Sequence, residues 1–165
     1  MFKVSVGHYT CALLPSDDST EPTVTLGCGE LYEYRLRIES HTYPEDRFVI
    51  AVKGDLPGLS THMLSVHPRS SIWFGIDTGV FAIDLARKAN VFALNLPSPF
   101  SFFAQIDVDR VLVVYETGLS LVDLDGVRVW DRGADIIEEI RIVDDCVYLS
   151  FGSSAGSVGV RTSRT

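Results

Sequence analysis

Two segments of this chain repeat one another without a gap, and no other feature limits its fold as strongly. Residues 72–85 (IWFGIDTGVFAIDL) align with residues 111–124 (VLVVYETGLSLVDL), 39 positions further along. Each copy has an apolar run, an acidic-Thr-Gly turn and a second apolar run that ends in Asp-Leu. Apolar runs on either side of a tight turn predict a β-hairpin. A lone hairpin cannot bury both faces, so the copies are expected to stack.

Alternation of apolar and charged residues predicts another strand nearer the N-terminus. In residues 32–39 (YEYRLRIE) every even position is apolar or aromatic and every odd position is charged. Successive side chains of a strand point to opposite faces, so this segment is expected to be half buried. Further strands are predicted at residues 48–52, 91–96, 102–106, 127–130 and 147–151, the last of which opens a third copy of the repeat, with weaker candidates at 2–6, 9–14 and 23–26.

Glycines mark the reversals between these runs, where a turn favours a positive φ. They occur in residues 54–58, 77–79, 116–118 and 125–126, and the Asp-Gly pair at 125–126 is the strongest hairpin signal. Helical patterning is confined to two segments. Residues 85–90 could make one turn, and in residues 134–142 a loop or helical turn is expected to lead into a strand.

The second copy, continued through its next turn, resembles a known repeat unit. Residues 123–130 (DLDGVRVW) follow the blade pattern of quinoprotein-like and related β-propellers, in which Leu-Asp and Gly precede a strand ending in Trp. The resemblance extends over residues 72–151 and implies stacked antiparallel blades. The first copy departs from this pattern, because residues 86–90 (ARKAN) replace the second Gly turn and the final Trp.

We therefore predict an all-β, mostly antiparallel fold of blade-like stacked hairpins, forming a partial propeller or a β-sandwich with at most one or two short helical turns. A chain of 165 residues is too short for a ring of about six to eight blades of about 40 residues each. Exposed sheet edges need covering, which favours a homodimer. We expect one domain over residues 1–165, with N-terminal strands in 1–60, blade-like repeats in 72–151 and a Gly/Ser-rich tail in 152–165 that is prone to fray.

Charge and cysteine content narrow the expected partners and compartment. The net charge of −8 disfavours nucleic-acid binding and suits a basic protein partner. No apolar run approaches the roughly 20 residues of a membrane helix, and no secretory signal is recognised, so a membrane is not an expected partner. Three cysteines without a short spacing predict the reduced thiols of a cytoplasmic protein.

Catalytic and metal-binding patterns are weak. His62 and His67 are the closest pair of histidines, but a spacing of five does not place both on one face of a helix or strand. Residues 152–156 (GSSAG) match the nucleophile elbow, yet no His follows them and no helix is predicted after them. Acidic pairs such as Asp107 with Asp109 suit turns better than catalysis. We expect no cofactor.

Aromatic residues supply the candidate binding site. Phe100, Phe102 and Phe103 follow a Pro-Ser-Pro segment. Neighbouring residues of a strand face opposite sides, so one of Phe102 and Phe103 must pack under a second layer or belong to an exposed patch.

Two main functional hypotheses follow. The first is a non-enzymatic binding or protein-interaction module with a protein partner, such as an acidic bacterial immunity-type or assembly protein. The alternative is a small metal-dependent hydrolase in which His62 and His67 hold a metal ion together with a carboxylate such as Asp77 or Glu116. A third interpretation is sugar or small-ligand binding through exposed aromatic rings at Phe102 or Phe103.

Overall fold

The computed structural model of the chain is all-β, as predicted. It describes residues 3–14, 18–55, 62–66, 69–133, 137–143, 146–151 and 154–161. The regular structure of these residues consists of strands, and no helix occurs among them. It follows that the described part of the chain holds no helix that could cross a membrane.

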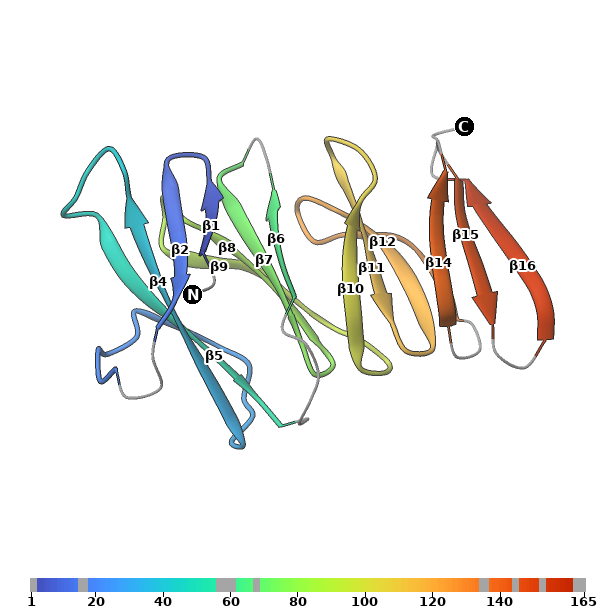
Figure 1. Cartoon of the computed structure of the whole chain (residues 1–165), viewed down its shortest axis with the longest axis horizontal. Helices are drawn as coiled ribbons and strands as arrows, with labels where there is room; N and C mark the ends of the chain where they lie inside the picture. Colours follow the sequence, from blue (N-terminus) through green and yellow to red (C-terminus); the bar gives the residue numbers. More distant parts are fainter. Residues whose placement is uncertain are drawn as a thin grey trace.

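Sixteen strands of the described residues form four sheets, which stand one behind another along the long axis of the molecule (Figure 1). The first sheet has the order β1-β2-β4-β5-β3, from β1 (Lys3–Val6), β2 (Tyr9–Leu13), β3 (Val24–Leu26), β4 (Tyr32–Ser40) and β5 (Arg47–Gly54). The second sheet contains β6 (His62–Val66), β7 (Ser71–Ile76), β8 (Gly79–Asp84) and β9 (Ala89–Asn95). The third contains β10 (Phe100–Gln105), β11 (Arg110–Tyr115), β12 (Gly118–Asp123) and β13 (Arg128–Gly133). The fourth contains β14 (Ile137–Val143), β15 (Cys146–Phe151) and β16 (Ser154–Arg161).

The last three sheets are meanders, in which each strand pairs antiparallel with the next one along the chain. The first sheet differs, because β3 pairs parallel with β5 at its edge. Adjacent sheets also touch through their leading strands: β6 contacts β1 on one side and β10 on the other. The predicted stack of antiparallel hairpins is therefore confirmed.

The two copies of the repeat form equivalent hairpins in neighbouring sheets. The first copy forms β7 and β8, and the second forms β11 and β12. The first copy reaches its third strand without a glycine, because Lys88 adopts a left-handed backbone with a φ of 53°. In the second copy Gly126 takes this role with a φ of 84°. A helical turn was predicted for residues 85–90, but residues 85–88 form a tight turn between β8 and β9, and residues 89–90 belong to β9.

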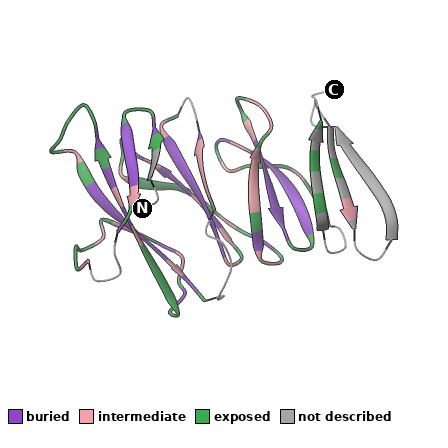
Figure 2. Ribbon diagram, viewed as in Figure 1, coloured by how far each residue is buried: buried purple, intermediate pink, exposed green. Residues whose placement is uncertain are grey.

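The core depends on strands that are apolar on both faces. In β7, Ile72 and Phe74 pack into the cluster between the first and second sheets, whereas Trp73 packs into the cluster between the second and third. In β11, Val113 points to the second sheet and Leu112 to a third cluster on the opposite face. Figure 2 shows that buried residues, coloured purple, are concentrated in these central strands. Each middle sheet is thus covered on both sides, because its strands bury apolar residues on both faces.

Two glycine predictions need correction. At the β7–β8 turn the positive φ belongs to Asp77 (51°), not to Gly79. Gly118 in the equivalent turn does not adopt a positive φ either; a Cβ there would lie 2.6 Å from the Arg132 carbonyl oxygen and 2.6 Å from the Tyr115 ring. Gly118 is therefore required by close packing rather than by backbone conformation.

Two C-terminal segments are more regular than the sequence suggests. Within residues 134–142 the strand begins at Ile137, and residues 134–136 lie outside the described part. Residues 154–161 of the Gly/Ser-rich tail form β16, which pairs with β15. The third copy of the repeat thus also contains two paired strands.

Polar contacts tie one sheet to the next. Lys88 in the β8–β9 turn lies 2.6 Å from Asp46 of the first sheet, and the Tyr9 hydroxyl donates to the same carboxylate at 3.0 Å. The hydrogen bond from Lys88, opposed in part by desolvation, lowers the pKa of Asp46. Arg69 of the second sheet pairs with Asp125 in the β12–β13 turn. These ties fix the turns of adjacent sheets relative to one another.

We expect Gly126→Ala to lower the free energy of unfolding by about 1–2 kcal/mol, because an L-residue is strained in the left-handed region. Its added methyl group would also meet the ring of Phe92. Denaturant unfolding measures the effect. Gly133→Ala is the matched control, since its methyl group would meet no atom within 4 Å. Equal stability of the two variants would contradict the turn geometry.

Candidate functional site

The outer face of the first sheet carries charged side chains in an alternating row. On β4 the core-facing residues Leu36 and Ile38 are buried, whereas Arg35, Arg37 and Glu39 face away from the second sheet. The half-buried strand predicted from residues 32–39 is confirmed. On β5 the same alternation places Val49 and Ala51 on the outer face, yet Val49 is only 4% exposed and Ala51 is fully buried. Something must therefore cover this face.

The cover is the segment of residues 18–23, which leads into β3. The guanidinium of Arg35 donates through one nitrogen to the carbonyl oxygens of Asp18 at 2.9 Å and Thr20 at 3.0 Å. The amide of Thr23 donates to the carbonyl oxygen of Val49 at 2.7 Å. The backbone carbonyl and amide groups of this segment lose contact with water where it packs on the sheet, and these hydrogen bonds give them partners. Arg35 thus holds an irregular segment over a charged sheet face.

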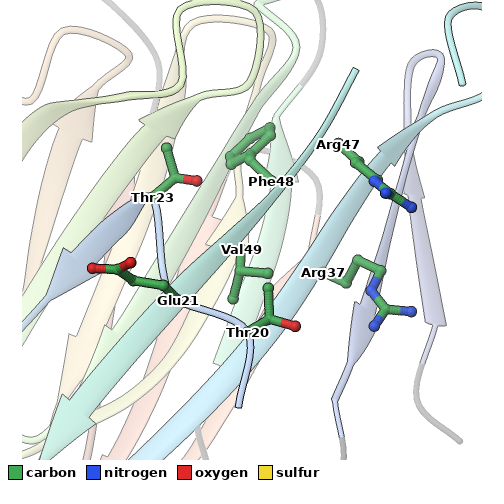
Figure 3. Close-up of a pocket in the computed structure, with 7 residues that line it drawn as sticks. All are labelled: Thr20, Glu21, Thr23, Arg37, Arg47, Phe48 and Val49. Carbon is green, nitrogen blue, oxygen red and sulfur yellow. The ribbon is translucent and has the colours of Figure 1, made fainter. Parts of the chain in front are cut away.

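A hollow of about 360 Å³ lies between this segment and strands β4 and β5, and we call it the first-sheet hollow. Its volume is at the lower end of small-molecule sites. Threonine hydroxyls, two guanidinium groups and two apolar side chains surround it. Its lining residues are Thr20, Glu21, Thr23, Arg37, Arg47, Phe48 and Val49 (Figure 3).

Figure 3 shows how these side chains are directed. Arg37 and Arg47, from the neighbouring strands β4 and β5, extend to the same side, and the hydroxyl of Thr20 points toward Arg37. The two arginines occupy diagonal positions of the sheet, since Arg37 pairs in register with Val49. Glu21 points away from both arginines. The cationic groups therefore lie together on one side of the hollow, apart from the lining carboxylate.

Two nearby carboxylates already compensate the positive charge of Arg37. One of its nitrogens lies 3.2 Å from the carboxylate of Asp18, and another lies 3.9 Å from Glu39. Hydrogen bonds from the Thr20 hydroxyl and amide, aided by Arg37 and Arg35, lower the pKa of Asp18. Asp18 therefore remains ionised at neutral pH, and its charge is matched to that of Arg37.

Arg47 differs from Arg37 in having no such neighbour. Across the described ranges, no hydrogen bond or ion pair is formed by its guanidinium. Its cross-strand neighbour Glu39 is the residue that approaches Arg37 instead. The first-sheet hollow thus contains one positive charge without a compensating carboxylate.

The predicted aromatic site is not a single site in the structure. Phe100 is 3% exposed and packs with Phe103 in the cluster between the second and third sheets, with ring centroids 4.5 Å apart. Phe102 packs on the opposite face of the third sheet. A register shift between Phe100 and Phe102 puts Phe100 and Phe103 on one face. The opposed faces predicted for Phe102 and Phe103 are observed, and both rings contact apolar clusters.

The histidine pair of the metal hypothesis falls mostly outside the described part. His62 lies in β6, opposite Gly75 of β7, but its side chain and the whole of His67 are not described. Of the carboxylates named with them, Asp77 accepts a hydrogen bond from the Asp55 amide at 2.6 Å, and Glu116 lies exposed in the β11–β12 turn. The described side chains include no cluster of three His, Cys, Asp or Glu suited to a metal ion. The metal site stays a prediction.

Two of the weaker sequence motifs can be placed in the structure, and neither forms a catalytic arrangement there. Ser154 of the GSSAG motif begins strand β16, so it does not lie on a turn from a strand into a helix. The carboxylate of Asp107 accepts a hydrogen bond from the Asp109 amide at 2.9 Å, which is an Asx turn. The turn role predicted for the Asp107–Asp109 pair is confirmed.

Sequence reasoning missed the first-sheet hollow. It predicted no strand between residues 14 and 23 and expected the strand of residues 32–39 to be only half buried. A usable signal was present, since Arg35 and Arg37 share one face of a predicted strand beside a segment rich in carbonyl and hydroxyl acceptors. Nothing in the sequence, however, indicated that residues 18–23 fold back over that face.

Comparison with known proteins identifies the fold but no family. No family model and no curated protein matches this sequence. The structure of apo AztD from Citrobacter koseri is similar, with a TM-score of 0.56 and 12% sequence identity. The match covers 98% of this chain and 55% of that chain, so this chain spans about half the length of the matched structure. At this identity the likeness concerns the fold alone.

We expect Arg35→Gln to release the covering segment, because a neutral amide cannot replace both charge-assisted hydrogen bonds to its carbonyls. Hydrogen exchange of the Thr23 amide should become about tenfold faster. Arg87→Gln is the matched control, since that side chain is 83% exposed and lies in the second sheet. Unchanged exchange at Thr23 in the Arg35 variant would show that other contacts hold the segment.

Proposed function

We propose that the chain is a non-enzymatic binding module and that the first-sheet hollow receives an anionic group of its ligand. The observation that carries this proposal is the guanidinium of Arg47, which lacks a charged partner among the described side chains and faces the same side as Arg37. Guanidinium groups recognise carboxylates and phosphates through two parallel hydrogen bonds. The hydroxyl of Thr23 lines the same hollow and can donate a further hydrogen bond, whereas the hydroxyl of Thr20 already donates to Asp18.

The chemistry of these groups supports binding rather than reaction. General acid–base catalysis needs a group that gains and loses a proton near the working pH. Arginine keeps its protons throughout that range. The carboxylate of Asp18 is held ionised, because hydrogen bonds from Thr20 and the charge of Arg37 lower its pKa. The groups at this end of the hollow are therefore suited to hold a charge in place.

The net negative charge of the chain limits how the hollow can attract an anion. A net charge of −8 repels anions at long range, so the first-sheet hollow must act through short-range contacts. Binding should then be selective for ligands that reach the guanidiniums and make additional contacts. The expectation that an acidic chain prefers a basic partner applies to its surface as a whole and not to this local cationic site.

We expect Arg47→Gln to weaken the binding of acetate or inorganic phosphate by about tenfold, because the unpaired charge is lost. Titration followed by NMR chemical shifts detects such weak binding. Arg87→Gln serves as the control for a general change in net charge. If neither anion shifts any signal, or if both bind equally to the Arg47 variant and the wild type, the hollow is not an anion site.

A second proposal concerns assembly, and the length comparison favours it. The four sheets follow one another in series, so the first and the last each have a single neighbouring sheet (Figure 1). The match to AztD covers nearly this whole chain but about half of that structure. We infer that a second copy of the chain extends the stack at the fourth sheet, because residues 18–23 already cover the outer face of the first sheet. The blade-like pattern of residues 123–130 supports this inference.

Light scattering coupled to size exclusion should then give a mass of about twice 18.2 kDa at high protein concentration. Dilution should shift the protein toward the monomer, because a two-fold assembly depends on concentration. A mass of one chain at every concentration would contradict the assembly proposal. It would leave the proposed ligand site untouched, since the hollow is built within one chain.

A further inference from the structure

One face of the fourth sheet, at the end of the series in Figure 1, is open to solvent. Glu139, Arg141 and Val143 occupy alternate positions of β14, so their side chains point to one side. The side chains of Glu139 and Arg141 are 65% and 70% exposed, and Val143 is 45% exposed. The register adds Tyr148 and Ser150 of β15, because paired residues of neighbouring strands share a face. We call these five residues the fourth-sheet face.

Two rows cross this face at right angles to the strands, and they differ in charge and size. The first row pairs Arg141 with Tyr148, and the register continues it to Gly159 of β16, which has no side chain. The second row pairs Glu139 with Ser150. One row is therefore cationic and carries a large ring, whereas the other is anionic and carries a small hydroxyl.

A two-fold axis that runs across the strands between the rows would exchange them. Arg141 of one copy would then lie over Glu139 of the second copy, and Tyr148 would lie over Ser150. The symmetry repeats each contact, so opposite charges meet twice. A long side chain also meets a short one, which suits the spacing of about 10 Å between packed sheets. The fourth-sheet face is thus complementary to itself.

We propose that the fourth-sheet face binds the same face of a second copy of the chain, with Arg141 paired to Glu139 of that copy. This inference rests on the proposed assembly and adds its interface and its symmetry. A head-to-tail stack would need the outer face of the first sheet. Arg35 holds residues 18–23 over that face, so a fourth sheet cannot pack on it. A face that pairs with itself closes after two copies.

The charges of the face favour this contact. Two copies that each carry a net charge of −8 repel one another, so they associate only where the local charge is balanced. The described charged residues of the face are one acid and one base. Within one chain Arg141 and Glu139 lie 3.9 Å apart and are exposed, so their own ion pair contributes little and is readily exchanged.

The same composition predicts a weak dimer. The clusters between sheets inside the chain are apolar, whereas the fourth-sheet face is mostly polar and extends over three strands. Small polar interfaces are typical of reversible complexes. We expect a dissociation constant on the order of 100 µM. Sedimentation equilibrium of the whole chain from about 10 µM to about 1 mM measures it.

Charge reversal tests the pairing between copies. Glu139→Arg and Arg141→Glu should each weaken self-association at least tenfold, because each variant places like charges opposite one another twice. An equimolar mixture of the two variants should regain the wild-type dissociation constant, since every Arg then meets a carboxylate. Both positions are exposed, so the monomers should unfold like the wild type.

Two control variants make the same changes in net charge elsewhere. Glu116→Arg and Arg87→Glu replace exposed side chains in turns of the third and second sheets, and both should self-associate like the wild type. Tyr148→Ser removes the ring without a change in charge. It should weaken the dimer by about tenfold, because the apolar area that the ring buries is lost.

The outcomes separate this inference from the assembly proposal. Wild-type association of both charge-reversal variants would overturn the fourth-sheet face as the interface, while a dimer that still formed would support assembly by another surface. Weakened variants that do not recover on mixing would overturn the two-fold pairing. A wild-type chain that remains monomeric up to about 1 mM would overturn both proposals.

Discussion

The structure depends on burying both faces of its central hairpins. A strand such as β7 carries Phe74 toward the first sheet and Trp73 toward the third, so neither face tolerates water. A hairpin of this kind is stable only between two other sheets, which explains why the repeat units stack in series. The rings of Trp73 in the second sheet and Phe103 in the third pack edge to face with centroids 6.1 Å apart, and such contacts add specificity to the packing between sheets. The order of the sheets follows the order of the chain because each meander is completed before the next begins.

A stack of this kind must end, and the end of the first sheet is where the candidate site forms. Its outer face replaces apolar residues with a charged row, and residues 18–23 cover that face instead of another sheet. An irregular segment fits a sheet less closely than a second sheet does, because its side chains do not follow the period of two. The first-sheet hollow lies between the two surfaces. The site is therefore a consequence of how the stack is terminated.

Tyr115 and Ser120 are buried residues whose hydroxyl groups have partners that give them a structural role. Desolvation and a hydrogen bond to Asp131 raise the pKa of Tyr115 to about 12, so its hydroxyl stays protonated and donates at 2.7 Å. Ser120 donates to the same carboxylate at 2.5 Å. These contacts join β11, β12 and β13 within the third sheet. Arg47 differs from them, because it is exposed and its guanidinium forms no hydrogen bond or ion pair with the described residues; it is therefore the group that we propose to bind a ligand.

The sequence by itself determined the all-β class, the stacked hairpins and nearly every strand, because these depend on local alternation and on turns between neighbouring segments. It also determined that Phe102 and Phe103 face opposite sides. Local pattern did not distinguish a glycine needed for its φ, such as Gly126, from one needed for space, such as Gly118, because the second reason lies in contacts with Tyr115 and Arg132. Only the tertiary structure decided that residues 18–23 cross the first sheet and that Arg47 is left without a partner. Such pairings join residues distant in sequence, and their geometry is set by packing rather than by periodicity.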